Sequence, residues 1–315
     1  MDSSISLENI RAATTVIDPA FLHTPQFACE PLSERVGVTT LLKVESVNPI
    51  RSFKGRGADY LLHRLGDEAL RLVCASAGNF GQGMAYACRK REIPLTVFAA
   101  HTANPLKLER MRALGARIEL EVGDFDRAKD AAKRHAQSTG ETYVEDGLIG
   151  AIAEGAATIA VELSEDSALD AVFVPLGNGS LVNGIGTWLK DASHSTRVIA
   201  VCAGGAPSMA LSFEAHRVID AASNTIADGI AVRVPVPEAV EIMARTVDEV
   251  MLVSDNEMRQ AMRWLLLDAG LVIEPAGAAG VAAIAQRGSE FAGKRVATVL
   301  TGGNLTPQQI RDWLG

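Results

Sequence analysis

Short apolar runs alternate with longer amphipathic stretches through most of the 315-residue chain. The runs are only a few residues long and bounded by polar or turn-forming residues, which is typical of buried strands. They predict strands at 70–75, 95–99, 117–121, 142–144, 171–174, 198–201 and 296–300.

The stretches between these runs show the apolar spacing of helices that cover a sheet. They predict helices at 105–114, 125–138, 151–163, 181–192, 257–269 and 276–285, and a last helix from about residue 306. Strands that alternate with helices at close intervals indicate parallel sheets covered by helices, so we predict an α/β protein. The stretch 203–237 interrupts the alternation, and we expect it to be irregular.

Composition excludes several classes of protein. The chain is 48% hydrophobic and 22% charged, which is typical of a globular protein, and its net charge of −8 argues against nonspecific binding of nucleic acid. No apolar run approaches the roughly 20 residues that a membrane span needs, and the first residues lack the apolar core of a signal peptide. The four cysteines are scattered without a C-x-x-C pair, which is typical of a reducing compartment. We therefore expect a cytoplasmic protein that binds neither nucleic acid nor membranes.

One lysine lies where the chain leaves a loop. The run Asn48–Ala58 places Lys54 between Phe53 and Gly55. Partial burial favours a neutral amine, which can condense with an aldehyde to form a Schiff base, and pyridoxal phosphate is a natural aldehyde partner. Alone, the run also fits a solvated lysine at the start of a helix, because most lysines lie at the surface.

Small residues follow the predicted strand 70–75 in the loop Ser76-Ala77-Gly78-Asn79. The free N–H groups at the start of the next helix can hold a carboxylate. The side-chain amide of Asn79 can donate a hydrogen bond to a phenolic oxygen. Alone, this loop fits an ordinary strand-to-helix turn equally well.

A glycine-rich loop follows the predicted strand 171–174, with the sequence Gly177-Asn178-Gly179-Ser180-Leu181. Such a backbone at the start of a helix can hold a phosphate dianion. The loop is no dinucleotide fingerprint, because Val182 stands where the third glycine is required, and no Gly-Lys-Ser/Thr of a P-loop follows. It is therefore interpreted as a compact phosphate cup.

A third loop, around Thr301, follows the predicted strand 296–300. A hydroxyl there can hydrogen-bond a ring nitrogen without forcing its protonation, whereas an aspartate would hold the pyridinium form. Asn79, Gly177 and Thr301 all follow the carboxyl ends of strands, which is where ligands bind in open α/β sheets.

Taken in order, these segments resemble the fold-type II pyridoxal phosphate enzymes, and among them the serine/threonine dehydratases (threonine ammonia-lyases) and serine racemase. Two further segments carry the resemblance, A-D-G-I-A-V at 227–232 and E-P-A-G-A-A-G at 274–280. The resemblance implies a tryptophan synthase β-like fold with two lobes, each an open, mostly parallel sheet covered by helices. The large, cofactor-binding lobe would comprise 1–66 and 149–315, and the small lobe, which carries the substrate carboxylate loop, 67–148.

The resemblance also implies a role for each matching residue. Lys54 would be the catalytic lysine that forms the Schiff base with pyridoxal 5′-phosphate and moves the Cα proton, and Phe53 would pack against the cofactor ring. The other implied cofactor-binding residues are Asn79, Gly177, Asn178, Gly179, Ser180, Leu181, Glu274 and Thr301. The implied substrate-binding residues are Ser76, Ala77, Gly78 and Asn79.

Several positions depart from the family pattern. Ala77 replaces the serine that is the second catalytic base of the racemase, which argues against racemisation. Phe80 replaces a histidine common in dehydratases and makes the substrate side more apolar. Cys202 stands where relatives have a glutamate of a divalent-cation site, so we expect that site to be lost, unless Asp228 and backbone carbonyls rebuild it. Whether a metal site persists stays open at this point.

The resemblance implies β-elimination from a β-hydroxy amino acid such as L-threonine or L-serine, giving a 2-oxo acid and ammonia, and we expect a homodimer. Other fold-type II reactions remain open: threonine synthase, β-replacement, or a lyase acting on hydroxyaspartate or diaminopropionate. A non-catalytic protein that binds pyridoxal phosphate is the alternative from another class. Retention of Lys54, Asn79 and the phosphate loop argues against it.

Overall fold

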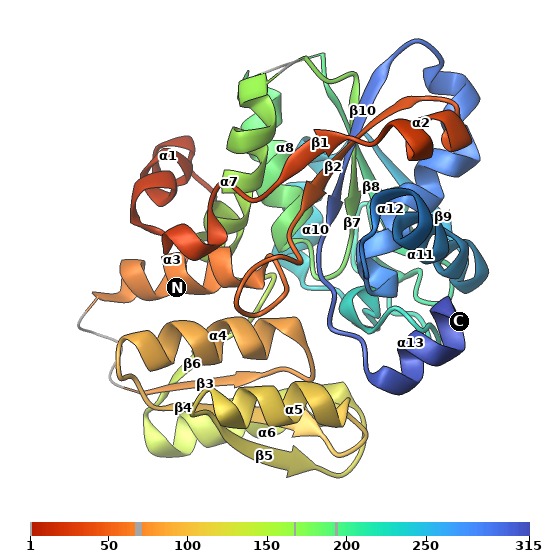
Figure 1. Cartoon of the computed structure of the whole chain (residues 1–315). Coiled ribbons are helices and arrows are strands. Elements are labelled where there is room, and N and C mark those ends of the chain that lie inside the picture. Colours follow the sequence, from red (N-terminus) through yellow and green to blue (C-terminus); the bar gives the residue numbers. More distant parts are fainter. Residues whose placement is uncertain (1, 67–70, 167, 193–194) are drawn as a thin grey trace.

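Helices cover two separate sheets in the computed structural model, which describes residues 2–66, 71–166, 168–192 and 195–315 (Figure 1). Leu70, the first residue of a predicted strand, and the predicted start of the small lobe at residue 67 lie outside these residues. Both sheets are mostly parallel and flanked by helices, which confirms the predicted α/β class.

The larger sheet has six strands in the order β1-β2-β10-β7-β8-β9. Only β1 runs antiparallel to its neighbour, and every other pair in this sheet is parallel. The strands are β1 (Gln26–Ala28), β2 (Thr39–Val44), β7 (Ala171–Pro175), β8 (Arg197–Ala203), β9 (Glu249–Val253) and β10 (Arg295–Leu300).

The smaller sheet has four parallel strands in the order β5-β4-β3-β6. They come from one continuous part of the chain and lie at the lower left of Figure 1. The strands are β3 (Leu72–Ala75), β4 (Leu95–Ala100), β5 (Arg117–Glu121) and β6 (Thr142–Val144).

Alternating side chains of the central strands fill the two faces of the larger sheet. Val172 and Val174 of β7 pack on the face covered by α7 (Gly150–Asp166), α8 (Ser180–Ala192) and α10 (Pro237–Thr246). Phe173, between them, packs on the face covered by three other helices. Those three are α2 (Glu30–Val36), α11 (Asp255–Ala269) and α12 (Pro275–Arg287).

The smaller sheet is covered in the same way. Helices α4 (Asn79–Lys90) and α5 (Pro105–Ala113) contribute to the core on one face, together with Ala58, Leu61 and Leu62. Three alanines of α6 (Phe125–Thr139) pack on the other face, against Val73 and Phe98.

Helix α3 (Lys54–Leu65) lies between α4 of the smaller sheet and α7 of the larger one (Figure 1). Glycines allow this close packing on both sides. A Cβ atom on Gly83 of α4 would lie 2.8 Å from the carbonyl oxygen of Lys54. One on Gly57 of α3 would lie 2.5 Å from the carbonyl oxygen of Ile152 in α7. The position of α3 is therefore tightly constrained.

The remaining elements lie at the periphery or in connections. They are α1 (Leu7–Val16), α9 (Ser208–Ala215), α13 (Pro307–Leu314) and the short 3₁₀ segments η1 (Pro19–Phe21), η3 (Asp228–Ile230) and η4 (Gly288–Phe291). No helix in the described part of the chain is both long and apolar enough to cross a membrane.

The predicted strands and helices are confirmed within a few residues at their ends. The prediction that 203–237 is irregular is wrong in part, because α9 lies within it. This helix has eight residues and no side-chain cap at its first turn, so the usual start signal is missing. The strands β1, β2 and β9 were not predicted.

A charged cluster is buried beneath α3. The Arg56 side chain is fully buried and binds the carboxylates of Glu45 and Glu162 through two hydrogen bonds each, at 2.5–3.0 Å. Lys43 lies 2.5 Å from the second Oε of Glu162, so two cations face two carboxylates. The cluster joins β2, α3 and α7 two residues after Lys54.

We expect Arg56→Met to lower the free energy of unfolding by about 3–5 kcal/mol, because it leaves a buried carboxylate without its partner. Urea denaturation would measure the change. Arg117→Ala is the matched control, because this arginine is 72% exposed in its pair with Glu119, and its loss should change stability by at most about 0.5 kcal/mol. Equal effects of the two substitutions would contradict the expectation.

Candidate active site

The strand register brings three loops to one edge of the larger sheet. Leu300 of β10 pairs with Val44 of β2, and Thr298 of β10 pairs with Phe173 of β7. The carboxyl ends of these three strands are therefore nearly level. The loops that begin after them carry Lys54, the predicted phosphate cup and Thr301, as parallel sheets commonly arrange their ligand sites.

The smaller sheet contributes a second set of loops at the carboxyl ends of its own strands. In its parallel pairing Cys74 of β3 lies opposite Val144 of β6. The loop Ser76–Gly78 and the loop that contains Asp146 therefore leave from the same edge. Contacts described below join these loops to the larger sheet, so the site lies where the two edges meet.

The loop before Lys54 is fixed by backbone hydrogen bonds. The N–H of Phe53 donates to the carbonyl oxygen of Thr301 at 3.1 Å, and Ser52 forms an antiparallel bridge with Gly302. These bonds hold Lys54, the first residue of α3, beside the Thr301 loop.

The amine of Lys54 is partly buried and faces the site. Its side chain is 15% exposed, and Nζ lies 2.5 Å from Oδ2 of Asp146. Nζ also lies 4.7 Å from the centroid of the Phe53 ring and 5.9 Å from that of Phe80. The amine of Lys54 therefore contacts one carboxylate and lies near two aromatic rings.

The phosphate cup lies close to Asp146. The hydroxyl of Ser180, the first residue of α8, donates to Oδ1 of Asp146 at 2.6 Å. Gly179 has φ +96°, and a Cβ on Gly177 would lie 2.8 Å from the carbonyl oxygen of Gly229. Both positions require glycine, and the helix N-terminus beside them suits a phosphate group.

Asn79 belongs to a hydrogen-bonded group that spans both sheets. Its Nδ2 donates to Oε1 of Glu274 at 2.5 Å, and its Oδ1 accepts from Nδ2 of Asn304 at 2.9 Å. The backbone N–H of Asn304 donates to the other carboxylate oxygen of Glu274 at 3.1 Å. Gly302 packs directly against this group, because a Cβ atom there would lie only 2.5 Å from Oε1 of Glu274.

Lys107 of α5 crosses from the smaller sheet to this group. Its side chain is 2% exposed, with Nζ 2.6 Å from Oδ2 of Asp228 and 3.9 Å from Oε2 of Glu274. Burial raises the pKa of Glu274, and Lys107 only partly opposes the effect. Burial alone would lower the pKa of Lys107, but the carboxylates of Glu274 and Asp228 outweigh it and raise that pKa.

The predicted substrate loop lies beside the same lysine. A Cβ on Gly78 would lie 3.9 Å from Nζ of Lys107. Ser76 is buried, and its hydroxyl accepts hydrogen bonds from the N–H groups of Gly78 and Gly81 at 3.2 and 2.8 Å. Ala77 follows it in the loop and is half-buried.

Sequence reasoning missed three residues of this site: Asp146, Lys107 and Arg110. Arg110 of α5 hydrogen-bonds Oδ1 of Asn304 across the two sheets, and burial together with the nearby Arg51 lowers its pKa. The position of Asp146 after a predicted strand was a usable signal for that residue. Helix α5 offered no such signal, because charged residues on a helix are usually solvated.

The two residues considered for a metal site, Asp228 and Cys202, have other surroundings in the structure. Asp228 binds Lys107, and Cys202 is buried, which raises the pKa of its thiol to about 12. Within the described residues, no group of three or more His, Cys, Asp or Glu side chains could hold a metal ion. The loss of a cation site remains a prediction.

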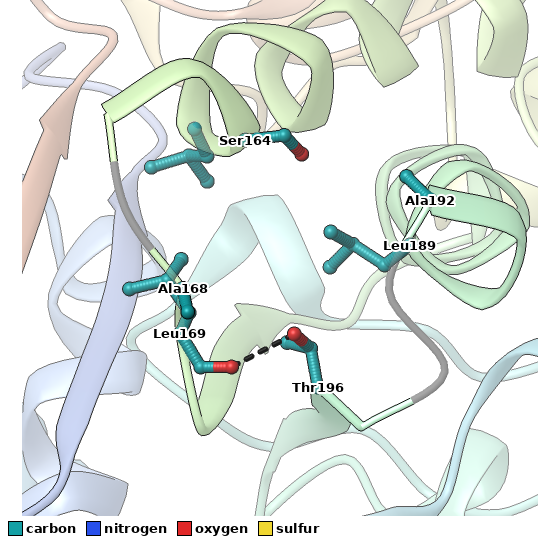
Figure 2. A pocket seen from close by; sticks show the side chains of 7 residues that line it. Ser164, Ala168, Leu169, Leu189, Ala192 and Thr196 are labelled. Atoms are coloured by element: carbon teal, nitrogen blue, oxygen red, sulfur yellow. Dashed lines mark hydrogen bonds between the residues drawn. The ribbon is translucent and has the colours of Figure 1, made fainter.

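A hollow of about 230 Å³ lies at the opposite edge of the larger sheet (Figure 2). Leu169 and Thr196 line it just before β7 and β8 begin, and the hydroxyl of Thr196 donates to the carbonyl oxygen of Leu169 at 2.8 Å. The other lining residues come from the ends of α7 and α8 and from Ala168, and none of the seven is titratable. This hollow therefore offers no acid–base side chain for catalysis, unlike the site at the carboxyl ends of the strands.

We expect Lys107→Met to destabilise the protein increasingly as the pH rises. A carboxyl group whose pKa is raised in the folded state stabilises the fold at pH values below its pKa in the unfolded state, here 4.5. This stabilisation is lost as the pH rises through the pKa of the folded state. The charge of Lys107 favours the ionised form of Glu274 and so limits this loss, and Lys107→Met removes that charge. Urea denaturation from pH 4.5 upwards would measure it, with a deficit of about 3 kcal/mol near neutral pH.

Asp228→Asn is the matched control, because this carboxylate is 53% exposed and its loss should cost about 1 kcal/mol or less. A Lys107→Met deficit that does not change with pH would contradict the expectation.

Comparisons with known proteins agree on one family. The pattern of the "Pyridoxal-phosphate dependent enzyme" family matches residues 17–302. An L-threonine ammonia-lyase of Thermotoga maritima is 35% identical over 97% of this chain and 77% of its own length. A biosynthetic L-threonine dehydratase of Halalkalibacterium halodurans is 32% identical over 95% of this chain and 74% of its own.

Solved structures give the same result. Maize serine racemase superposes with a TM-score of 0.91 at 26% identity, covering 98% of this chain and 96% of the racemase. The fold, the matched residues and these relatives together show that the chain belongs to the pyridoxal-phosphate-dependent enzymes of fold type II.

Proposed function

We propose that the protein catalyses β-elimination from a β-hydroxy amino acid such as L-threonine or L-serine, releasing a 2-oxo acid and ammonia. One observation carries the proposal: Lys54, Asn79, the phosphate cup and Thr301 meet where the carboxyl edges of the two sheets come together. The likeness to relatives named as threonine ammonia-lyases and dehydratases supports the choice of reaction and of substrate class.

The residues present fit pyridoxal 5′-phosphate. Gly177, Gly179 and the N-terminus of α8 would hold the phosphate, with Asn178, Ser180 and Leu181 completing the cup. Lys54 would hold the aldehyde carbon, with Phe53 against the ring. Thr301, 5% exposed at the end of β10, would face the ring nitrogen, and Asn79, oriented by Glu274, would donate to the ring oxygen. Once bound, the cofactor supplies an electron sink for the negative charge that develops at the substrate Cα.

The chain's own residues would then bind the substrate and move its protons. Ser76, Ala77, Gly78 and Asn79 would hold the substrate carboxylate at the N-terminus of α4. Nζ of Lys54 would take the Cα proton. The Phe80 ring, 6% exposed, would exclude water from the substrate side. The hydroxyl at Thr301 would leave the ring nitrogen unprotonated, which favours prompt loss of the β-substituent.

We also propose that the chain forms two lobes. The large lobe comprises residues 1–66 and 149–315, and the small lobe comprises residues 67–148. The origin of β3 to β6 from one continuous segment supports them.

A cytoplasmic homodimer is proposed as well. Exposed apolar side chains at α11 and just after it, Leu267 (76%) and Val272 (39%), support self-association, which sedimentation velocity would test.

We expect Lys54→Ala to abolish both 2-oxo acid release and the visible absorbance of the bound cofactor, because the other amine described in the site, that of Lys107, is held by Asp228 and lies near Glu274. The assay measures 2-oxo acid from L-serine, L-threonine and β-substituted analogues. Lys90→Ala is the matched control, since that lysine is 53% exposed and pairs with Asp18. Full turnover by Lys54→Ala would refute the proposal, and wild-type protein that binds the cofactor without turnover would favour the non-catalytic alternative.

We expect the wild type to eliminate with little or no racemisation, because the methyl group of Ala77 cannot move a proton. Ala77→Ser should raise racemisation of serine by roughly 10²-fold or more, the lower end of what a placed acid–base group contributes. Chiral chromatography would measure it. Ala75→Ser, which places the same hydroxyl against α6, is the control, and comparable racemisation and elimination by the wild type would overturn the expectation.

A further inference from the structure

The carboxylate of Asp146 lies between the proposed catalytic amine and the phosphate cup. Its Oδ2 is 2.5 Å from Nζ of Lys54, and its Oδ1 accepts from the hydroxyl of Ser180 at 2.6 Å. The side chain is only 10% exposed. Among the described residues, Lys54 is the one basic side chain in ion-pair contact with it.

The backbone around Asp146 holds the carboxylate in this place. Gly147 has φ +93°, and a Cβ there would lie 2.6 Å from the carbonyl oxygen of Asn178. The loop after β6 therefore rests directly on the phosphate cup. The preceding residue, Glu145, turns away and pairs with Lys129 and Lys133 of α6.

We propose that Asp146 is a proton relay that carries a proton from Lys54 to the departing β-hydroxyl group. This inference rests on the proposed elimination. A hydroxyl group leaves readily only as water, so an acid must act at the β-oxygen. The base that takes the Cα proton must lie within hydrogen-bond reach of it. The β-carbon is one bond further on, and Asp146 is already in contact with that base.

The relay balances without an external proton. Nζ of Lys54 takes the Cα proton, and the electron pair of the Cα–H bond becomes the second bond between Cα and Cβ. The ammonium of Lys54 passes a proton to Oδ2 of Asp146. The carboxyl group gives this proton to the β-oxygen as the Cβ–O bond breaks with its pair on oxygen. Water leaves, and Lys54 and Asp146 return to their starting protonation states.

A comparison of leaving groups tests the relay. Chloride leaves β-chloroalanine without a proton, whereas the hydroxyl of serine requires one. We expect Asp146→Asn to slow elimination from L-serine by at least about 10²-fold and that from β-chloroalanine by less than about tenfold. Equal losses on both substrates, or no loss on serine, would overturn the proposal.

Two further variants keep the test decisive. Glu145→Gln removes one negative charge from the adjacent residue without touching Lys54, and its serine to β-chloroalanine ratio should equal that of the wild type. Asp146→Glu keeps the carboxyl group and should regain part of the serine rate. If Asp146→Asn does not fold, the ratio is measured in Asp146→Ala, which also lacks the carboxyl group, and a wild-type ratio there overturns the relay.

A binding measurement gives a readout independent of turnover. We expect cofactor-free Asp146→Asn to bind inorganic phosphate several-fold more tightly than the wild type in calorimetry, because a negative charge beside Ser180 is removed. Unchanged affinity would contradict the placement of Asp146 at the phosphate cup. Wild-type protein that eliminates from neither substrate would refute the proposed function itself, whereas wild-type turnover with parallel losses in Asp146→Asn refutes only the relay.

Discussion

The site depends on the parallel pairing of β2, β10 and β7, which sets the carboxyl ends of three strands at one level. The loops after these strands therefore begin at the same level along the strand direction, so Phe53 and Thr301 can form a backbone hydrogen bond. A slip of one residue in this register would turn the side chains of a strand to the opposite face and bury the wrong set. The core of the larger sheet therefore defines the site geometry.

A second constraint is the placement of α3 between the two sheets. Its backbone approaches α4 and α7 closely at Gly83 and Gly57, and Arg56 joins it to two buried carboxylates. Buried ion pairs contribute little net stability, but loss of one partner is costly. We therefore interpret the cluster as a device that holds one arrangement of α3, and with it the position of Lys54.

Charged side chains also connect the two sheets at the site. Lys107 and Arg110 of α5 reach Asp228, Glu274 and Asn304, while Lys54 and Ser180 share Asp146. Ionisable groups therefore lie both beside Lys54 and beside the substrate loop, where Lys107 is near Gly78, but Ala77 itself brings no group that could move a proton. The methyl group of Ala77 therefore supports the proposed elimination, which needs one base and one acid, over racemisation, which needs a base on each face.

The sequence alone predicted most of the strands and helices and the loops that carry the candidate site, because hydrophobic period, glycine spacing and Lys54 are local signals. The strands β1, β2 and β9 and the short helix α9 were not predicted, because each is brief. The roles of Asp146 and Lys107 needed the tertiary structure. Asp146 meets Lys54 across 92 residues and Lys107 meets Asp228 across 121, and no short-range pattern encodes a contact that only the packing of two sheets creates.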